Sequence, residues 1–179
     1  MMKKINVIDL DKTLIPFDSF RSVVLQELKK GNVSLIFITL LRLLRIISNS
    51  RFKEVSSKIF INKYEEVYFR KMATDILKKI DKEVFDIITH ETDKHTINIL
   101  LSASPNFYVD YLIGELNWEG SGSYFDEQNT FHHLYERGKI KWVKENFNTD
   151  QYSYNMAISD SSTDDKLLSL FKRGVKWKR

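Results

Sequence analysis

The sequence predicts an α/β fold: a parallel β-sheet with helices on both faces, and a small all-helical region inserted after the first strand. Short apolar runs at residues 5–8, 96–101 and 152–159 alternate with helical patterns, as in sheets whose strands are joined by crossover helices. Residues 18–79 carry helical patterns with few breakers, which predicts the insertion. We expect a core of residues 1–15 and 80–179 and a helical cap of residues 16–79.

The composition is that of a globular protein of 179 residues. Hydrophobic residues make up 42% and aromatic residues 13% of the chain, which is enough for a core and excludes a disordered protein. The absence of cysteine excludes disulfides, thiolate metal sites and a cysteine nucleophile. The basic start has only a short apolar stretch before Asp9, so we expect no signal peptide and a cytoplasmic protein.

After the first strand, at residues 5–8, we expect helices at about residues 18–30, 33–48, 52–62, 64–79 and 81–90. From Phe20 to Ile80 the chain has thirteen Lys and Arg against five Asp and Glu, a net charge of +8 in a protein whose formal net charge is +4. A basic segment of this kind suits an anionic substrate or an anionic surface.

The expected helix at residues 33–48 is strongly apolar. Thr39, Arg42 and Arg45 recur at helical spacing, so a narrow polar face opposes a wide apolar one. Its uncharged run is too short to span a membrane. We expect the apolar face to pack against neighbouring helices. The alternative is peripheral docking on an anionic membrane through this face and the two arginines.

The second half of the chain returns to alternating strands and helices. We expect a strand at 96–101, a helix at about 106–116, turns with one or two small strands around Gly120, and a helix at 139–147. A last strand at 152–159 precedes an acid-rich segment and a helix that continues to Phe171. We expect the basic tail from Lys172 to Arg179 to be a solvated chain end.

Polar side chains follow each expected strand. Asp9, Asp11 and Thr13 come directly after the first strand, Ser102 after the second, and Asp160 after the last. The carboxyl ends of parallel strands meet at one edge of a sheet, where ligands bind in α/β proteins. Two carboxylates placed together repel each other unless a cation or a shared proton compensates. Asp9 and Asp11 therefore indicate a metal-assisted catalytic site.

These clusters, taken in order, resemble the four motifs of the haloacid dehalogenase-like (HAD) hydrolase superfamily: Asp9-x-Asp11-x-Thr13, a strand ending in Ser102, a helix opened by Lys139, and Asp160-Ser-x-x-Asp164. The helical insertion resembles the cap of the phosphoserine-phosphatase-like branch, and the resemblance covers essentially the whole chain. It implies a Rossmann-like core and a Mg²⁺-dependent phosphatase that hydrolyses a small phosphomonoester through an aspartyl-phosphate intermediate.

The resemblance also implies a role for each acidic residue of the motifs. Asp9 attacks the phosphorus, while Asp11 protonates the leaving alcohol and then deprotonates the hydrolytic water. Mg²⁺ is held by Asp9, by the backbone carbonyl of Asp11 and by Asp160, with Asp164 as a further ligand or as a residue that supports one.

The other two motifs are implied to bind the phosphoryl group. Ser102 and the backbone N–H groups that follow it, beginning with Ala103, hold phosphate oxygens, and Lys139 neutralises charge on the nucleophile and the transferred group. Lys141 lies two residues further on, but Lys139 puts Trp142 and Val143 at core-facing spacings, so we prefer Lys139.

Two residues depart from the usual motif patterns. Lys12 stands where a small residue is usual, and Ser159 stands where glycine is usual. Neither position supplies essential chemistry in the family, so we expect both to be tolerated.

Other polar residues have more than one interpretation. Asp18 either contacts the substrate or caps the helix that follows it, and we expect Ser104 to cap the helix after residue 105. Arg51, Arg70 and His132 are further candidates for contacting the substrate, and the sequence leaves their role open.

Other functions are open from the sequence. A phosphatase acting on a lipid or sugar phosphate at the membrane surface, and a phosphomutase or phosphotransferase, would use the same pair of aspartates. A receiver-like signalling domain is disfavoured because the clusters come in the wrong order, and a catalytically silent binding domain because crowded carboxylates repel each other. We expect a small phosphorylated substrate and no nucleic acid; the oligomeric state is open.

Overall fold

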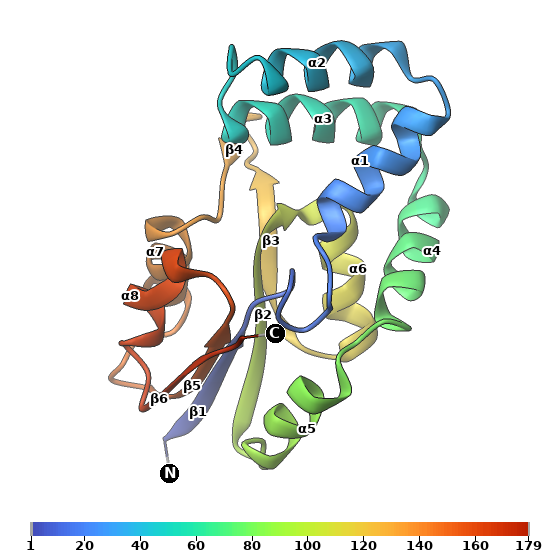
Figure 1. The fold of residues 1–179 in the computed structure, drawn as a ribbon. Coiled ribbons are helices and arrows are strands. Elements are labelled where there is room, and N and C mark those ends of the chain that lie inside the picture. Colours follow the sequence, from blue (N-terminus) through green and yellow to red (C-terminus); the bar gives the residue numbers. More distant parts are fainter. Residues whose placement is uncertain (1, 179) are drawn as a thin grey trace.

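The computed structural model describes residues 2–178, and Figure 1 shows a sheet at its centre with helices around it. Among these residues, six strands form one sheet in the order β4-β3-β2-β1-β5-β6. The strands are β1 (Lys3–Ile8), β2 (Thr96–Pro105), β3 (Glu119–Phe125), β4 (Phe131–His132), β5 (Tyr152–Ser159) and β6 (Arg173–Lys176). Neighbouring strands are parallel except β3 and β4, which are antiparallel. The predicted parallel sheet is confirmed.

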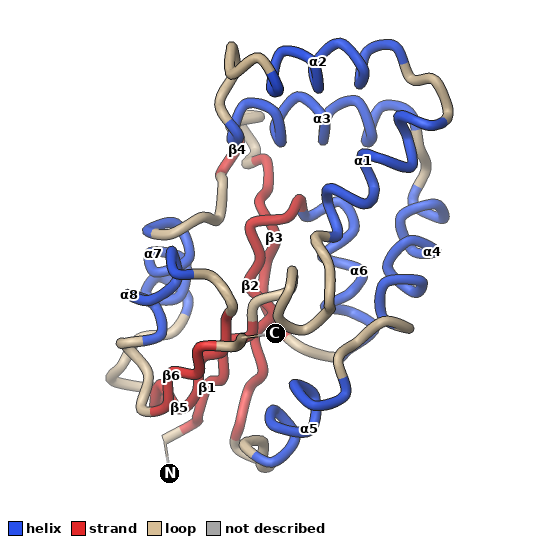
Figure 2. Tube along the Cα trace, in the orientation of Figure 1, coloured by secondary structure: helices blue, strands red, loops and turns tan. Residues whose placement is uncertain are grey.

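Both faces of the sheet are buried. Alternate strand residues point to opposite sides, so each strand contributes apolar side chains to both faces. On one face Ile8 shares a core with Val84, and on the other Val7 shares a second core with Val143. The helices that cover the two faces, seen on either side of the strands in Figure 2, are α5 (Lys82–His90), α6 (Asn106–Leu116), α7 (Arg137–Asn146) and α8 (Asp165–Leu168). This arrangement confirms the predicted α/β class.

Between β1 and α5 the chain forms the helices α1 (Ser19–Lys29), α2 (Val33–Leu43), α3 (Asn49–Lys63) and α4 (Glu66–Leu77). In Figure 1, α2 and α3 lie above the carboxyl ends of the strands, and α4 lies beside α6. The side chains of Asp18, Asn32 and Ser48 begin the first three helices, each accepting a backbone N–H from the first turn. The rings of Phe60 and Phe69 pack on Phe107 of α6, which fastens this helical region to the sheet.

The helical region leaves and rejoins the rest of the chain at one place. The N–H of Asp81 donates to the carbonyl of Leu14, 2.8 Å away. This bond joins the segment just after β1 to the segment just before α5. The long excursion between them therefore has its two ends held together.

The predicted helix at residues 33–48 is too long. α2 ends at Leu43, because Arg45 adopts a left-handed backbone conformation (φ 59°) and Ser48 already caps α3. This stretch has neither glycine nor proline, so the sequence gives no stop signal. Within residues 2–178, every helix falls short of the length and hydropathy that crossing a membrane requires.

The prediction of a solvated tail is wrong. β6 runs parallel to β5, with Gly174 opposite Ala157 and Val175 opposite Ile158. It is a short edge strand rich in basic residues, so it lacks the apolar alternation by which a strand is recognised. The predicted helix to residue 171 is also shorter, since a 3₁₀ turn (Ser162–Asp164) precedes α8, which ends at Leu168.

Two further boundaries differ from expectation. β2 continues past Ser102 to Pro105: β3 pairs with residues 99–101 and again with Pro105, and the pairing is irregular in between. Gly120 allows the close pairing: a Cβ at this position would lie 1.9 Å from the carbonyl oxygen of Leu100. α7 begins at Arg137, which makes Lys139 its third residue rather than its first.

Candidate active site

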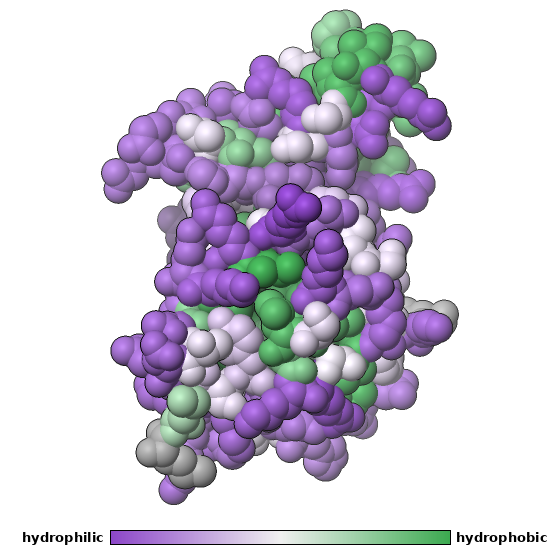
Figure 3. All heavy atoms as spheres, turned by 90° about the vertical axis from the view of Figure 1, so that its left-hand side faces the viewer, coloured by the Kyte–Doolittle hydropathy of each residue, from purple (hydrophilic) through white to green (hydrophobic). Residues whose placement is uncertain are grey.

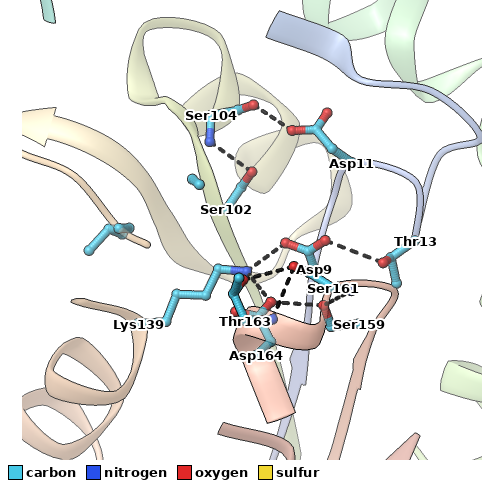
Figure 4. A network of polar contacts seen from close by, with 12 residues as sticks. Asp9, Asp11, Thr13, Ser102, Ser104, Lys139, Ser159, Ser161, Thr163 and Asp164 are labelled. Atoms are coloured by element: carbon cyan, nitrogen blue, oxygen red, sulfur yellow. Dashed lines mark hydrogen bonds and ion pairs between the residues drawn. The ribbon is translucent and has the colours of Figure 1, made fainter. Parts of the chain in front are cut away.

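The carboxyl end of β1 forms the centre of the site, because β1 lies between β2 and β5. Asp9 directly follows β1, and its N–H donates to the carbonyl of Ile158 in β5, 3.0 Å away. This bond extends the strand pairing by one residue and fixes the direction of the Asp9 side chain. Figure 4 shows that side chain between Lys139 and Thr13.

Lys139 joins two buried carboxylates. Its Nζ donates to Oδ1 of Asp9 and to Oδ2 of Asp164, at 2.7 Å in both cases. Burial alone would lower the pKa of Lys139, but the charges of Asp9 and Asp164 outweigh this effect and raise the pKa above its ordinary value. The ammonium group therefore stays charged beside Asp9. Lys141, by contrast, is exposed and pairs with Glu145.

Asp9 is a buried carboxylate, 9% exposed. Burial raises its pKa to about 6; the charge of Lys139 opposes this rise, and Asp164 adds to it. At neutral pH the group is mainly ionised, because its pKa is still below 7. An ionised, poorly hydrated carboxylate is the form that attacks phosphorus.

Asp164 is held by two donors. Its Oδ2 accepts from Lys139 and from the hydroxyl of Ser159, 2.8 Å away. Ser159 occupies the position where the family usually has glycine, and here its side chain orients Asp164. The carboxylate of Asp164 thus holds the ammonium group of Lys139 in place beside Asp9. Lys12, the other departure, has a left-handed backbone (φ 58°).

Thr13 lies between the first and last motifs. Its hydroxyl is 3.2 Å from Oδ2 of Asp9 and 3.4 Å from Oδ1 of Asp160, and it accepts the backbone N–H of Asp160 at 2.9 Å. One side chain therefore sets the spacing of two carboxylates that come from strands β1 and β5. The sequence-based assignment gave Thr13 no such role.

Asp11 accepts hydrogen bonds from two serines that the sequence analysis did not identify as its partners. Its Oδ1 accepts from the N–H and hydroxyl of Ser19, at 2.6 and 2.5 Å, and its Oδ2 accepts from the hydroxyl of Ser104 at 2.5 Å. Ser19 also contacts the hydroxyl of the buried Tyr108, 2.7 Å away. Burial raises the pKa of Asp11, although the hydrogen bonds from Ser104 and Ser19 work against the rise. Ser104 does not cap α6, so that prediction is wrong.

Ser102 lies on β2 next to this pair, with its buried hydroxyl accepting the N–H of Ser104 at 3.1 Å. The carbonyl of Ala103 accepts from Ser123, at 2.9 Å, and from Lys53 of α3, at 2.6 Å. Figure 4 places Ser102 between Asp11 and Lys139. The residues predicted to bind phosphate, Ser102 and the backbone that follows it, therefore lie near the end of β2 and beside Asp11.

Lys53, in helix α3 of the helical region, contacts this end of β2. Burial, the larger effect, lowers its pKa, and the negative charges of Asp11, Asp18 and Asp9 oppose the change. The sequence-based candidates did not include it. A signal was present: Lys53 lies seven residues before Phe60, so it shares the buried face of α3.

The other candidates in the helical region and the β3–β4 turn have local partners. Asp18 caps α1 by accepting the N–H of Arg21 at 2.8 Å, as one of its two interpretations predicted. Arg51 pairs with Glu54, and Arg70 pairs with Glu66. His132 pairs with Asp126 at the β3–β4 turn and stacks on Tyr124.

The donor set near Asp9 suits a magnesium ion. Asp9 and Asp160 supply two carboxylates that share the Thr13 hydroxyl, and the backbone carbonyl of Asp11 follows Asp9 by two residues. Mg²⁺ prefers hard oxygen ligands and uses one or two carboxylates while it keeps several waters. The carboxylate of Asp164 is already bound by Lys139 and Ser159. Among residues 2–178 there is no preformed cluster of three acidic or histidine side chains around a metal position.

Solved structures with the same fold include phosphatases. A protein with unknown function from Bordetella pertussis Tohama I has a TM-score of 0.71 and 12% identity, over 94% of this chain and 87% of that one. A phosphoserine phosphohydrolase-like protein from Francisella tularensis has a TM-score of 0.57 and 16% identity, over 94% and 82%. The phosphoserine phosphatase from T. onnurineus has a TM-score of 0.55 and 19% identity, over 96% and 82%.

A sequence search among curated proteins gives no match. The family model of the haloacid dehalogenase-like hydrolases matches residues 7–169, which include all four motifs. The strand order, the helical region after β1 and the placement of the motifs at one edge of the sheet agree with this match. The chain therefore belongs to the haloacid dehalogenase-like hydrolases.

Proposed function

We propose that this protein is a Mg²⁺-dependent phosphatase that hydrolyses a small phosphomonoester through an aspartyl-phosphate at Asp9. The observation that carries the proposal is the buried contact between Asp9 and Lys139 at 2.7 Å. It gives a nucleophilic carboxylate a fixed direction and a neighbouring cation that offsets the charge of an incoming phosphate. Within this proposal, residues 1–15 and 80–179 form the catalytic core and residues 16–79 form its cap.

In the first step, an Oδ atom of Asp9 forms a bond to phosphorus and the bond to the ester oxygen breaks. Asp11 gives its proton to the leaving alkoxide, so an alcohol departs. In the second step, Asp11 takes a proton from water, whose oxygen attacks the phosphorus, and Asp9 leaves as a carboxylate with inorganic phosphate. Burial raises the pKa of Asp11, which suits a group that must hold a proton before the first step.

Lys139 and Ser102 serve the transferred group. The ammonium of Lys139 already touches Asp9, and it offsets the charge that accumulates between the nucleophile and the phosphoryl oxygens. Ser102 and the backbone after it lie between Asp11 and Lys139, where the remaining phosphoryl oxygens need donors. Asp164 and Ser159 act through Lys139 by fixing its position.

Asp9, Asp160 and the carbonyl of Asp11 would hold the magnesium ion. When bound, the ion offsets the repulsion between the phosphate dianion and the carboxylate of Asp9. The Thr13 hydroxyl keeps Asp9 and Asp160 close before the ion binds, which reduces the reorganisation that magnesium binding requires.

Lys53 extends the site towards the substrate's other end. It comes from α3 in the helical region, and its contact with Ala103 puts a cation beside the end of β2 that is proposed to bind phosphate. A partly buried lysine at this position favours a substrate with anionic character next to the phosphate. A substrate panel that includes serine, sugar and lipid head-group phosphates would identify the alcohol.

The test is Asp9→Asn with an aryl phosphate as substrate. We expect the release of inorganic phosphate to fall to background, because an amide cannot form the covalent intermediate. The matched control is Asp86→Asn, which changes an exposed carboxylate on α5 and should keep full activity. Mass spectrometry of the acid-quenched wild type should show one phosphoryl group on the peptide that contains Asp9. Turnover retained in Asp9→Asn would refute the mechanism.

A further inference from the structure

Helix α2 exposes one continuous apolar face. Its outer positions and the turn that follows them carry seven large hydrophobic residues, which we call the α2 apolar face: Val33, Ile36, Phe37, Leu40, Leu43, Leu44 and Ile46. Val33 is 77% exposed, Leu43 72% and Phe37 62%. The spacing of three and four residues puts the members within α2 on one side of the helix.

The opposite side of α2 already has a partner. Leu35 and Ile38 are buried in the main core, and α2 packs along α3 through this side. We expected the whole apolar face of this helix to pack against neighbouring helices. Only the side with Leu35 and Ile38 does so, and the α2 apolar face stays exposed. Figure 3 shows the result, since an apolar patch stands out at the top of the molecule, at the height of α2 in Figure 1.

The charge around this face has one sign. From Leu28 to Lys53 the chain contains six Lys and Arg and no Asp or Glu. Arg45 is exposed in the turn after α2, between Leu44 and Ile46 of this face, whereas Arg42 follows the buried Leu35 and Ile38 on the inner side of the helix. An exposed apolar face with basic residues and no carboxylate in the surrounding sequence is the pattern of a helix that lies in the interface of an anionic bilayer.

We infer that the α2 apolar face, with Arg45, docks this protein on an anionic lipid bilayer. A second copy of the chain is a poorer occupant, because a two-fold contact through the same face would bring Arg45 towards its own copy. An anionic lipid surface instead neutralises this arginine while its acyl region takes up the apolar side chains. The inference does not rest on the proposed phosphatase activity.

Docking in this way would also place the active site near the lipid surface. α3 lies between α2 and the carboxyl edge of the sheet in Figure 1, and Lys53 of α3 donates a hydrogen bond to the carbonyl of Ala103 near the end of β2. One layer of helix thus separates the proposed lipid contact from the site.

The experiment is co-sedimentation of the whole protein with vesicles. One set contains phosphatidylcholine alone and the other contains equimolar phosphatidylcholine and phosphatidylglycerol. We expect the protein to pellet with the anionic vesicles and to stay in solution with the neutral ones, and we expect added salt to weaken the binding. Absence of binding to the anionic vesicles would overturn the inference.

Two variants locate the surface. Phe37→Gln combined with Leu44→Gln removes two exposed apolar side chains, and binding should weaken about tenfold or more. Arg45→Asn removes one charge, and binding should weaken by about fivefold; asparagine suits the left-handed backbone at position 45. The matched controls are Val67→Gln on α4, 75% exposed, and Lys141→Gln on α7, which should bind like the wild type.

Activity and oligomeric state separate the remaining outcomes. All four proteins should hydrolyse a soluble aryl phosphate as the wild type does, because none of the changes touches the active site. Vesicle binding that is unchanged in both α2 variants would overturn the proposed surface. A wild-type dimer that becomes monomeric in Phe37→Gln with Leu44→Gln, as measured by light scattering, would assign the face to a second copy and overturn the inference as well.

Discussion

Lys53 donates a hydrogen bond to the backbone carbonyl of Ala103, 2.6 Å away, and so connects helix α3 to the carboxyl-terminal part of β2. The two residues are far apart in the sequence and belong to different parts of the fold. Their contact brings a partly buried cation from the helical region to the edge of the sheet where Asp9 and Asp11 lie. A change in the helical region can therefore act directly on the site.

Replacing Lys53 by methionine should lower kcat/KM by about tenfold to a hundredfold, which corresponds to losing one charged hydrogen bond to the substrate. Methionine keeps the length and apolar stem of the side chain, so the free energy of unfolding should change little. Steady-state kinetics with an anionic and a neutral phosphate ester would show the larger loss for the anionic one. Lys58→Met, on the same helix and 40% exposed, is the matched control. Equal losses for both esters would contradict a role in substrate binding.

Replacing Lys139 by methionine should abolish activity and lower the free energy of unfolding by about 3–5 kcal/mol, because Asp9 and Asp164 lose their shared buried cation. Urea denaturation followed by circular dichroism measures the stability change. Lys141→Met tests the assignment of this motif, since its side chain is 74% exposed and should tolerate the change. A catalytic loss in Lys141→Met with none in Lys139→Met would reverse the assignment.

Glu27 of α1 should make the protein sensitive to acid. Burial would raise its pKa, but hydrogen bonds from Lys63, Tyr64 and Asn32 together lower it to about 2. Since the pKa in the folded state lies below that in the unfolded chain, the stabilisation is present above about pH 4.5 and disappears as the pH falls towards 2. It amounts to about 3 kcal/mol.

Thermal unfolding of the wild type and of Glu27→Gln, recorded from neutral to acidic pH, measures this contribution. The variant should be less stable near neutral pH, and the two curves should converge as the pH falls. Glu83→Gln, which changes an exposed side chain in the first turn of α5, should follow the wild type throughout. A constant gap between the curves of Glu27→Gln and the wild type would show that the ionisation of Glu27 is not the cause.

Removal of divalent metal with a chelator should abolish phosphatase activity, and Mg²⁺ should restore it. Asp160→Asn should require about tenfold to a hundredfold more Mg²⁺ for half-maximal activity, because one anionic oxygen ligand is lost. A magnesium titration of initial rates measures the shift. Asp165→Asn, on a neighbouring exposed acid, should leave the titration unchanged. Full activity of the chelated wild type would refute the metal requirement.

Much of the site could be predicted because its residues follow strands. Asp9, Ser102 and Asp160 are each preceded by an apolar run, and parallel strands bring their carboxyl ends together. The α/β class followed from the same alternation. The hydrogen bonds from Ser19 and Ser104 to Asp11 could not be predicted, because a serine near a helix start is equally suited to capping the helix.

Other features escaped prediction for different physical reasons. The end of α2 at Leu43 is set by the backbone of Arg45, a residue type that gives no helix-stop signal. β6 forms because β5 offers a free edge to it, and its own residues are mostly basic. Lys53 appeared as one of thirteen basic residues; its spacing to Phe60 places it on the buried face of α3, but only its contact across the fold reveals that it reaches the site.

The hydrogen bond between Asp81 and Leu14 has a consequence for how such a protein can evolve. Because the two ends of the helical excursion meet there, the sheet is connected across it as if by a short loop, and loop length has only a weak effect on stability. Helices in the excursion can lengthen, shorten or change their surface while the strand order and the four motifs stay in place. Selection for new substrates or locations can therefore act on one continuous segment of the gene and leave the strand order unaltered, as long as the contacts of Ser19 and Lys53 with the site are kept.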